Sequence, residues 1–276
     1  MNKKYSNSVL IILSVFVFFP RFVLAETILE KIKRTGELNV GVRKDAIDFG
    51  YVNTQGKWTG YSVDLIRLIH KKLEQELNQP IKLNLREATI DSRFRIVQRG
   101  DVDIVCGATT ITQTRLTKVD FSVPFFMTGA QFLVKLKDAP NLDYNGNLTD
   151  IPIAFLPGTT TQEIIPQIYP LANWKDIRSR EEGVRKLTQN EVKAVVSDGI
   201  LLLGEIVQQG GSIGDFVLLP SQPITRELYG CILPQENTEF KQLVNLTILS
   251  PDNRILAKEW FSINSGEFPY IIEQKD

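Results

Sequence analysis

A weak internal repeat constrains the fold of this chain more than any other feature of its sequence. Residues 94–108 align without a gap to residues 184–198, at an offset of 90 residues. The shared positions include an arginine near the start, an acid in the middle and two valines towards the end. In both copies this pattern predicts a helix, a tight turn at Gly100 or Asn190, and a buried strand. A chain that carries this unit twice is expected to contain two similar halves.

A second correspondence places an opening strand ahead of each copy. Residues 38–42 alternate apolar residues in the same way as residues 151–155, and this alternation is the period of a strand. Helical periods lie between the strands, for example over residues 62–77, where Pro80 stops the helix. Strands that alternate with helices indicate an α/β chain, built here as two similar lobes.

The composition is that of an ordinary soluble globular protein and excludes several other classes. The 276 residues contain 32 Lys plus Arg, 32 Asp plus Glu and 43% hydrophobic residues, which argues against disorder and collagen-like repetition. Without the first 25 residues, which hold basic side chains and no acid, the balance becomes slightly acidic. No basic stripe remains to neutralise phosphates, so we expect no nucleic-acid partner.

The amino terminus has the pattern of a secretory signal over residues 1–25. Lys3 and Lys4 precede an apolar run, and Val23 and Ala25 place small residues before the expected cleavage point. A membrane anchor is disfavoured, because the run is shorter than the roughly 20 residues that a bilayer crossing needs. We therefore expect a cleaved, soluble protein of the periplasm.

Cys106 and Cys231 are the only cysteines of the chain. An even pair in an exported chain is compatible with a disulfide. Each cysteine also lies in an apolar strand-like run, where a small buried thiol fits equally well, so both interpretations stay open. The two cysteines and the single histidine show no zinc-ligand spacing, and we expect neither a metal nor a cofactor.

The loops after the predicted strands contain the candidate ligand-binding groups, because ligands collect beyond the carboxyl ends of strands in open α/β sheets. Thr112 can cap a helix whose first turns contain Arg115, and a guanidinium beside free N–H groups suits a carboxylate. A capped helix with a surface arginine is the alternative. Asp198 ends another predicted strand and suits an ammonium group, and its alternative is the N-cap of the next helix. Together the two groups suit a zwitterion, of which α-amino acids are the simplest.

Several segments together resemble a known family, the type 2 periplasmic solute-binding proteins of polar amino-acid ABC importers (bacterial extracellular solute-binding protein family 3). These segments cover residues 60–65, 99–115, 119–125, 158–160, 195–198 and 229–231. The resemblance implies that Thr110 and Arg115, with the backbone near Ala108, bind the α-carboxylate of an amino acid. It also implies that Thr160 and Asp198 close on the amino acid from the other lobe, with Asp198 taking the α-ammonium.

Within that family the chain is most similar to the glutamate/aspartate binders, through segments such as Asp91-Ser-Arg93. The similarity implies that Arg43 and Arg93 face a side-chain carboxylate, since a second buried carboxylate needs a partner. A helix-surface position is the alternative for Arg93. The chain departs from this branch in three respects: its only histidine is His70, in the first half, Ala108 and Ile90 replace hydroxyl side chains, and Ala46 replaces an aromatic residue. Glutamine, asparagine or a broad polar range therefore stay open as ligands.

The resemblance implies a type II periplasmic-binding-protein-like fold with a central ligand cleft and two hinge segments. Its first lobe would comprise residues 26–130 and 229–276, and its second lobe residues 131–228, with crossings near residues 131–137 and 222–229. A ligand that contacts both lobes would close the hinge. The closed protein, which we expect to be a monomer, would then dock on the membrane permease of an ABC importer.

The main rival function is an exported enzyme on the same scaffold, of the cyclohexadienyl dehydratase type. That chemistry needs a general acid or base in the cleft, and Glu87 and Glu163 are candidates by position. Neither has a recognisable partner in the sequence, and no Gly-x-Ser-x-Gly motif, metal cluster or phosphate loop appears. We therefore expect a binding protein without catalytic residues.

Overall fold

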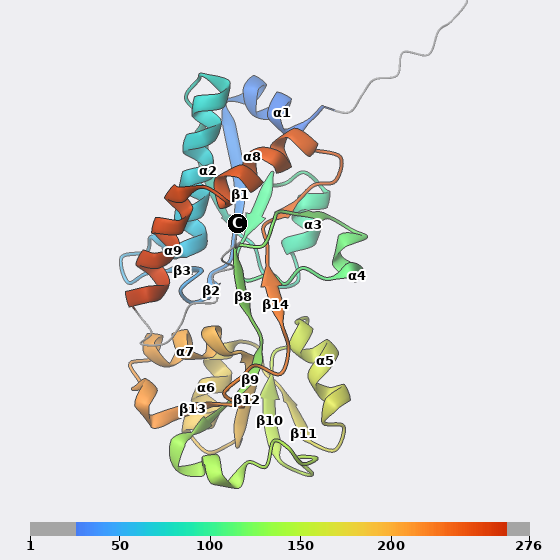
Figure 1. The fold of residues 1–276 in the computed structure, drawn as a ribbon, viewed down its shortest axis with the longest axis vertical. Helices are drawn as coiled ribbons and strands as arrows, with labels where there is room; N and C mark the ends of the chain where they lie inside the picture. The colour runs from blue at the N-terminus through green and yellow to red at the C-terminus, as the bar shows by residue number, and fades with distance from the viewer. Residues whose placement is uncertain (1–25, 264–276) are drawn as a thin grey trace, which may run out of the picture.

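The structure is a computed structural model that describes residues 26–263. The predicted secretory signal over residues 1–25 lies outside the described residues. Within the described range, no helix combines the length and the apolar character that a membrane crossing requires. The chain forms two lobes, one above the other in Figure 1, and two strands join them.

The first lobe contains both ends of the described chain. Its elements, in chain order, are α1 (Ile28–Thr35), β1 (Glu37–Val42), β2 (Asp45–Ala46), β3 (Gly50–Val52), β4 (Trp58–Thr59), α2 (Tyr61–Leu77), β5 (Lys82–Glu87), α3 (Arg93–Gln98), β6 (Ile104–Cys106), α4 (Gln113–Leu116), β7 (Asp120–Phe121) and, after the second lobe, β15 (Ile232–Leu233), α8 (Thr238–Ile248) and α9 (Pro251–Ile263). The predicted helix over residues 62–77 is confirmed as α2, and Gly36 ends α1 in the left-handed conformation.

The second lobe is one continuous stretch of chain. Its elements are β9 (Ala130–Lys135), η1 (Leu136–Asn141), β10 (Pro152–Phe155), α5 (Thr160–Ile168), β11 (Asn173–Asp176), α6 (Arg180–Thr188), β12 (Ala194–Asp198), α7 (Gly199–Gln208), η2 (Ile213–Asp215) and β13 (Phe216–Leu219).

The two five-stranded sheets share the arrangement of their first three strands and their strand directions, whereas the fourth strand comes last along the chain in the first sheet (β15) and first in the second (β9). The first runs β5-β1-β6-β15-β7 and the second β11-β10-β12-β9-β13. In each sheet the first three strands are parallel and the last two antiparallel to their neighbours. The turn residues of the internal repeat, Gly100 (φ 72°) and Asn190 (φ 62°), are both left-handed, which glycine and asparagine tolerate best. The prediction of two similar α/β lobes is confirmed.

Alternating side chains of the central strands fill separate cores on the two faces of each sheet. In β6, Ile104 and Cys106 belong to one hydrophobic cluster and Val105 to another. In the second lobe, Ile153 and Ala154 divide in the same way between two clusters. Such alternation follows from the two-residue period of a strand, and both sheets are therefore covered on both faces.

The two cysteines form a disulfide. Cys106, the last residue of β6, is bonded to Cys231 just before β15, and both are buried. The interpretation of two separate buried thiols is therefore wrong. The bond fixes the end of β6 beside the returning chain, directly before the loop that contains the candidate ligand-binding residues.

Two short strands that pair with each other carry the chain between the lobes. β8 (Phe126–Thr128) and β14 (Glu227–Tyr229) form an antiparallel ladder outside both five-stranded sheets (Figure 1). The second crossing agrees with the prediction. The first prediction, at residues 131–137, is wrong, because residues 130–135 form β9 and pair with β12 and β13 inside the second sheet. The lobe boundaries after residues 130 and 228 stay a prediction.

Candidate functional site

The structure brings the predicted site residues from both lobes to one place, at the carboxyl ends of the two sheets. The predicted site residues with buried side chains are Arg43, Arg93, Thr110, Arg115, Thr160 and Asp198, and Ala108 is half-buried. The lobes touch here, since Nη2 of Arg93 in the first lobe donates to the carbonyl oxygen of Gly158 in the second, at 3.3 Å. This convergence follows from the repeated topology, which places the strand ends of both sheets at the lobe interface.

Arg43 is the first of the buried arginines, and it is neutralised within its own loop. Its guanidinium donates to both carboxylate oxygens of Asp45, at 2.7 and 2.5 Å. Arg180 approaches the same carboxylate from the second lobe, at 3.7 Å. Burial raises the pKa of Asp45, but Arg43 and Arg180 outweigh it and lower that pKa to about 2. Asp45 is thus ionised and shared between two arginines of different lobes.

Arg93 has no such counterion. Its side chain is 3% exposed, so the helix-surface alternative is wrong. Its Nη1 donates to the carbonyl of Ile90 at 2.6 Å, whereas its Nε has no hydrogen-bond partner and no carboxylate of the described residues lies within 4.0 Å. Burial and the nearby charges of Arg43 and Arg115 lower the pKa of Arg93 to about 9. A buried guanidinium in these surroundings attracts an anion.

Arg115 is positioned by the short helix α4. Thr112 caps this helix by accepting the backbone N–H of Arg115 at 3.2 Å, as predicted, and the side chain folds back to donate to the carbonyl of Thr110 at 2.7 Å. Burial lowers the pKa of this arginine. Its guanidinium also has no carboxylate within 4.0 Å among residues 26–263. The surface alternative for Arg115 is therefore wrong as well.

Phe94 is a neighbour of both unpaired arginines that the sequence did not single out. The guanidinium carbons of Arg93 and Arg115 lie 4.8 and 5.6 Å from the centroid of its ring. Both distances are in the range of cation–π attraction. The ring therefore helps to hold two like charges near one another.

Asp198 lies at the N-cap position of α7, but its side chain makes no capping hydrogen bond, so the capping alternative is wrong. One carboxylate oxygen accepts the hydroxyl of Tyr229. The other oxygen is buried and has no hydrogen-bond partner among the described residues. Burial, followed by the charge of Glu227, raises the pKa of Asp198 to about 7. Arg180 and Arg115 lower this pKa only in part, and no cationic group of residues 26–263 comes within 4.0 Å of the carboxylate.

Glu227 is a second buried acid of the site that sequence reasoning missed. It is 2% exposed, lies on the crossing strand β14, and accepts the hydroxyl protons of Thr110, Thr160 and Thr225. A signal was present in the sequence, because Glu227 and Tyr229 are two residues apart on a strand and their side chains therefore lie on the same side of it. The hydroxyl groups of the predicted residues Thr110 and Thr160 are thus hydrogen-bonded to the same carboxylate, which lies on the crossing strand β14.

The charges of the site are complementary to a small molecule with two anionic groups and one cationic group. Among residues 26–263, Arg93 and Arg115 have no carboxylate and Asp198 and Glu227 no cationic group within 4.0 Å, although all four are buried. Buried charges are tolerated when they are paired. A molecule that lies among these four groups would supply the missing partners, whereas Arg43 and Asp45 already satisfy each other.

The other residues considered from the sequence contribute no buried side chain to the site, although the nearby charge of Glu163 raises the pKa of Arg115 against the effect of burial. Glu87 and Glu163 are exposed, and Glu87 pairs with Lys44 at 2.9 Å. His70 lies on α2 with its Nε2 against the carbonyl of Ile81. No group of three or more His, Cys, Asp and Glu side chains within residues 26–263 is arranged to hold a metal ion.

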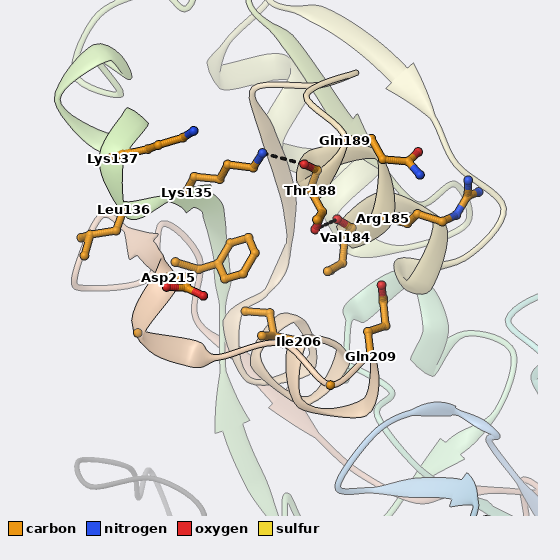
Figure 2. A pocket seen from close by; sticks show the side chains of 14 residues that line it. Lys135, Leu136, Lys137, Val184, Arg185, Thr188, Gln189, Ile206, Gln209 and Asp215 are labelled. Atoms are coloured by element: carbon orange, nitrogen blue, oxygen red, sulfur yellow. Dashed lines mark hydrogen bonds between the residues drawn. The ribbon is translucent and has the colours of Figure 1, made fainter.

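The second lobe also contains a cavity of about 720 Å³, away from this site, between the carboxyl ends of α6 and α7 and the segments η1 and η2 (Figure 2). Lys135 and Lys137 line it together with apolar residues such as Ile206 and Phe216. The ammonium group of Lys135 is already engaged by the carbonyl of Thr188, at 2.6 Å. None of the predicted site residues lines this cavity.

Comparisons with known proteins give related sequences and a shared fold. The profile of the bacterial extracellular solute-binding proteins, family 3, matches residues 38–261. An L-glutamate/L-aspartate-binding protein of Pseudomonas aeruginosa is 32% identical and aligns over 85% of this chain and 80% of its own length. A glutamate/aspartate import solute-binding protein of Escherichia coli K12 is 29% identical, over 86% and 79%. Among solved structures, an ancestral amino acid-binding protein, a precursor of cyclohexadienyl dehydratase, superposes with a TM-score of 0.72 at 24% identity and covers 85% of this chain and 99% of its own, which shows the shared fold.

Proposed function

The chain belongs to family 3 of the bacterial extracellular solute-binding proteins, and from this premise we propose that it captures an acidic L-amino acid, glutamate or aspartate, for an ABC importer. The ligand would bind between the two lobes and stabilise their closed arrangement. The closed protein would then deliver it to a membrane permease. We place this activity in the periplasm and assign it to a monomer.

One observation carries the choice of an acidic ligand: Arg93 is a buried guanidinium without a carboxylate partner in the part of the chain that the structure describes. A glutamate or aspartate side chain supplies a carboxylate at that position. The amide of glutamine or asparagine cannot neutralise the charge, and a ligand that leaves a buried charge unpaired loses affinity. The two relatives that bind glutamate and aspartate support the same choice.

The remaining residues of the site take roles that their chemistry allows. Arg115 would bind the α-carboxylate, with backbone N–H groups near Ala108, and Asp198 would accept the α-ammonium. Thr110 and Thr160 would contact the ligand from the two lobes. Arg43 would lie beside Arg93 near the side-chain carboxylate of the ligand, while its guanidinium stays paired with Asp45.

We propose binding without catalysis. Glu87 and Glu163, the two positional candidates for a general acid or base, are exposed. The acids within the site, Asp198 and Glu227, are engaged by a tyrosine and by threonines. The relatives named above are solute-binding proteins.

A thermal-shift panel of the twenty amino acids tests the proposal. Binding to the folded state alone raises stability by RT ln(1 + [L]/Kd), about 4 kcal/mol at a thousandfold excess over Kd. We expect L-glutamate or L-aspartate to raise the melting temperature most, and glutamine and asparagine much less. A largest shift with a neutral or basic amino acid would refute the choice of an acidic ligand.

The affinity for L-glutamate is expected to fall as the pH is lowered from 8 to 6. The pKa of Asp198 is raised to about 7, and an ammonium group beside it favours the ionised form. Below pH 7 binding must therefore release a proton, which weakens binding roughly tenfold at pH 6 relative to pH 8. Isothermal titration calorimetry in buffers of different ionisation enthalpy measures both the affinity and the released proton. A flat profile without proton release would contradict the role of Asp198.

A further inference from the structure

Glu227 connects hydroxyl groups of the two lobes through a single carboxylate oxygen. Thr110, from the loop after β6 in the first lobe, donates its hydroxyl proton to Oε2 at 2.6 Å. Thr160, at the start of α5 in the second lobe, donates to the same oxygen. Thr225 donates to Oε1 at 2.8 Å. No lysine, arginine or histidine of the described residues comes within 4.0 Å of this carboxylate.

The direction of these hydrogen bonds limits what the threonines can offer a ligand. A hydroxyl group has one proton to donate and two lone pairs that accept. While Thr110 and Thr160 donate to Glu227, their oxygens can only accept from a third group. An ammonium group donates, whereas a carboxylate only accepts. The two hydroxyl groups can therefore accept a hydrogen bond from an ammonium group, but they have no proton left to donate to a carboxylate.

The same strand that carries Glu227 also orients Asp198. Tyr229 lies two residues further along β14, on the same side, and its hydroxyl donates to Asp198. The second carboxylate oxygen of Asp198 is buried and has no hydrogen-bond partner within the described range. An isolated bridge between Thr110 and Tyr229 joins the loop after β6 to this strand. The crossing strand thus aligns a set of acceptors that come from both lobes.

We propose that Glu227 is a positioning residue for the ligand's ammonium group: it takes the hydroxyl protons of Thr110 and Thr160 and turns both oxygens into acceptors. This inference rests on the proposed function and extends it. It changes the expected part of Thr110, whose hydroxyl then faces the ammonium and leaves the α-carboxylate to Arg115 and to backbone N–H groups. Because the two threonines belong to different lobes, Glu227 also links ammonium binding to closure.

The test compares L-glutamate with glutarate, which has the same two carboxylates and no ammonium group. Calorimetry on the full protein measures both ligands with the wild type and with Glu227→Gln. An amide at residue 227 donates as well as accepts, so it no longer fixes both hydroxyl protons. We expect the affinity for L-glutamate to fall roughly 10- to 100-fold. The affinity for glutarate should stay within about threefold or rise, since a negative charge has been removed near a dianion.

Glu205→Gln is the matched control, because Glu205 is also a buried acid of the second lobe, and within residues 26–263 its side chain is hydrogen-bonded to Gln209 and not to Thr110, Thr160, Asp198 or Glu227. Its affinities for both ligands should equal those of the wild type. An equal loss of both ligands in Glu227→Gln, or no loss of L-glutamate, would overturn the positioning role while the proposed function stands. Failure of the wild type to bind any acidic amino acid would refute the proposed function itself.

A crystal structure with bound L-glutamate provides a second readout that does not depend on the stability of a variant. The hydroxyl oxygens of Thr110 and Thr160 should both lie within hydrogen-bond distance of the ligand nitrogen. Contact of both hydroxyls with a ligand carboxylate instead would overturn the inference.

Discussion

The variant Asp198→Asn is expected to lose at least about 100-fold in affinity for L-glutamate and, at the same time, to be more stable than the wild type without ligand. The loss follows because a buried ammonium group is left without its acid. The gain follows because the pKa of Asp198 is about 7 in the folded protein, through burial and the nearby Glu227, and 3.8 in the reference state. When the pKa of an acid is higher in the folded than in the unfolded protein, the free energy of unfolding decreases as the pH rises from the unfolded to the folded pKa.

The stability gain of Asp198→Asn should therefore be absent near pH 3.5 and complete above pH 7, where we expect about 1–3 kcal/mol. Urea unfolding at several pH values measures it. Glu205→Gln again gives the control, because burial raises the pKa of Glu205 to about 7 as well. This variant should become more stable at pH 8 and keep its affinity. If Asp198→Asn were less stable than the wild type at pH 8, Asp198 could not be a buried acid that destabilises the ligand-free protein for want of a cationic partner.

Local sequence patterns predict most of this fold because its elements are regular and repeated. The turn at Asn190 could be placed from its alignment with Gly100, since both residue types tolerate a left-handed backbone. The first crossing could not be placed, because residues 130–135 are mostly apolar and extended, a pattern that suits a crossing segment and a sheet strand equally. Only pairing with β12 and β13, which lie far away in the sequence, decides that they belong to the second sheet.

The candidate site was predictable where a side chain follows a recognisable strand, as Arg43 and Asp198 do, or lies in a helix with a recognisable cap, as Arg115 does. Glu227 was missed because its role depends on Thr110 and Thr160, which lie 117 and 67 residues away. The pairing of Arg43 with Asp45 was also missed, although the two are close in sequence. Without the structure, nothing distinguished a neutralised arginine from Arg93, which lies nearby and has no acid.

Arg93→Gln is expected to change the selectivity of the site as well as its affinity. The substitution removes the unpaired guanidinium and leaves an amide that can hydrogen-bond to an uncharged side chain. We expect the affinity for L-glutamate to fall by at least about 100-fold, because a buried carboxylate of the ligand then lacks its partner. Binding of L-glutamine should fall much less or improve, so that the ratio of the two affinities inverts or approaches one. Calorimetric titration with both amino acids measures this ratio.

Arg95→Gln is the matched control for that experiment, because Arg95 lies on the same helix two residues further along and is exposed. It makes the same chemical change without touching the site, and both affinities should match those of the wild type. The ligand-free Arg93→Gln protein should also be at least as stable as the wild type, since burial and neighbouring positive charges disfavour the guanidinium that it removes. Equal losses of L-glutamate and L-glutamine would instead mean that Arg93 acts only on the shape of the site. In that case the acidic side chain of the ligand would have to be recognised by Arg43, which already forms an ion pair with Asp45.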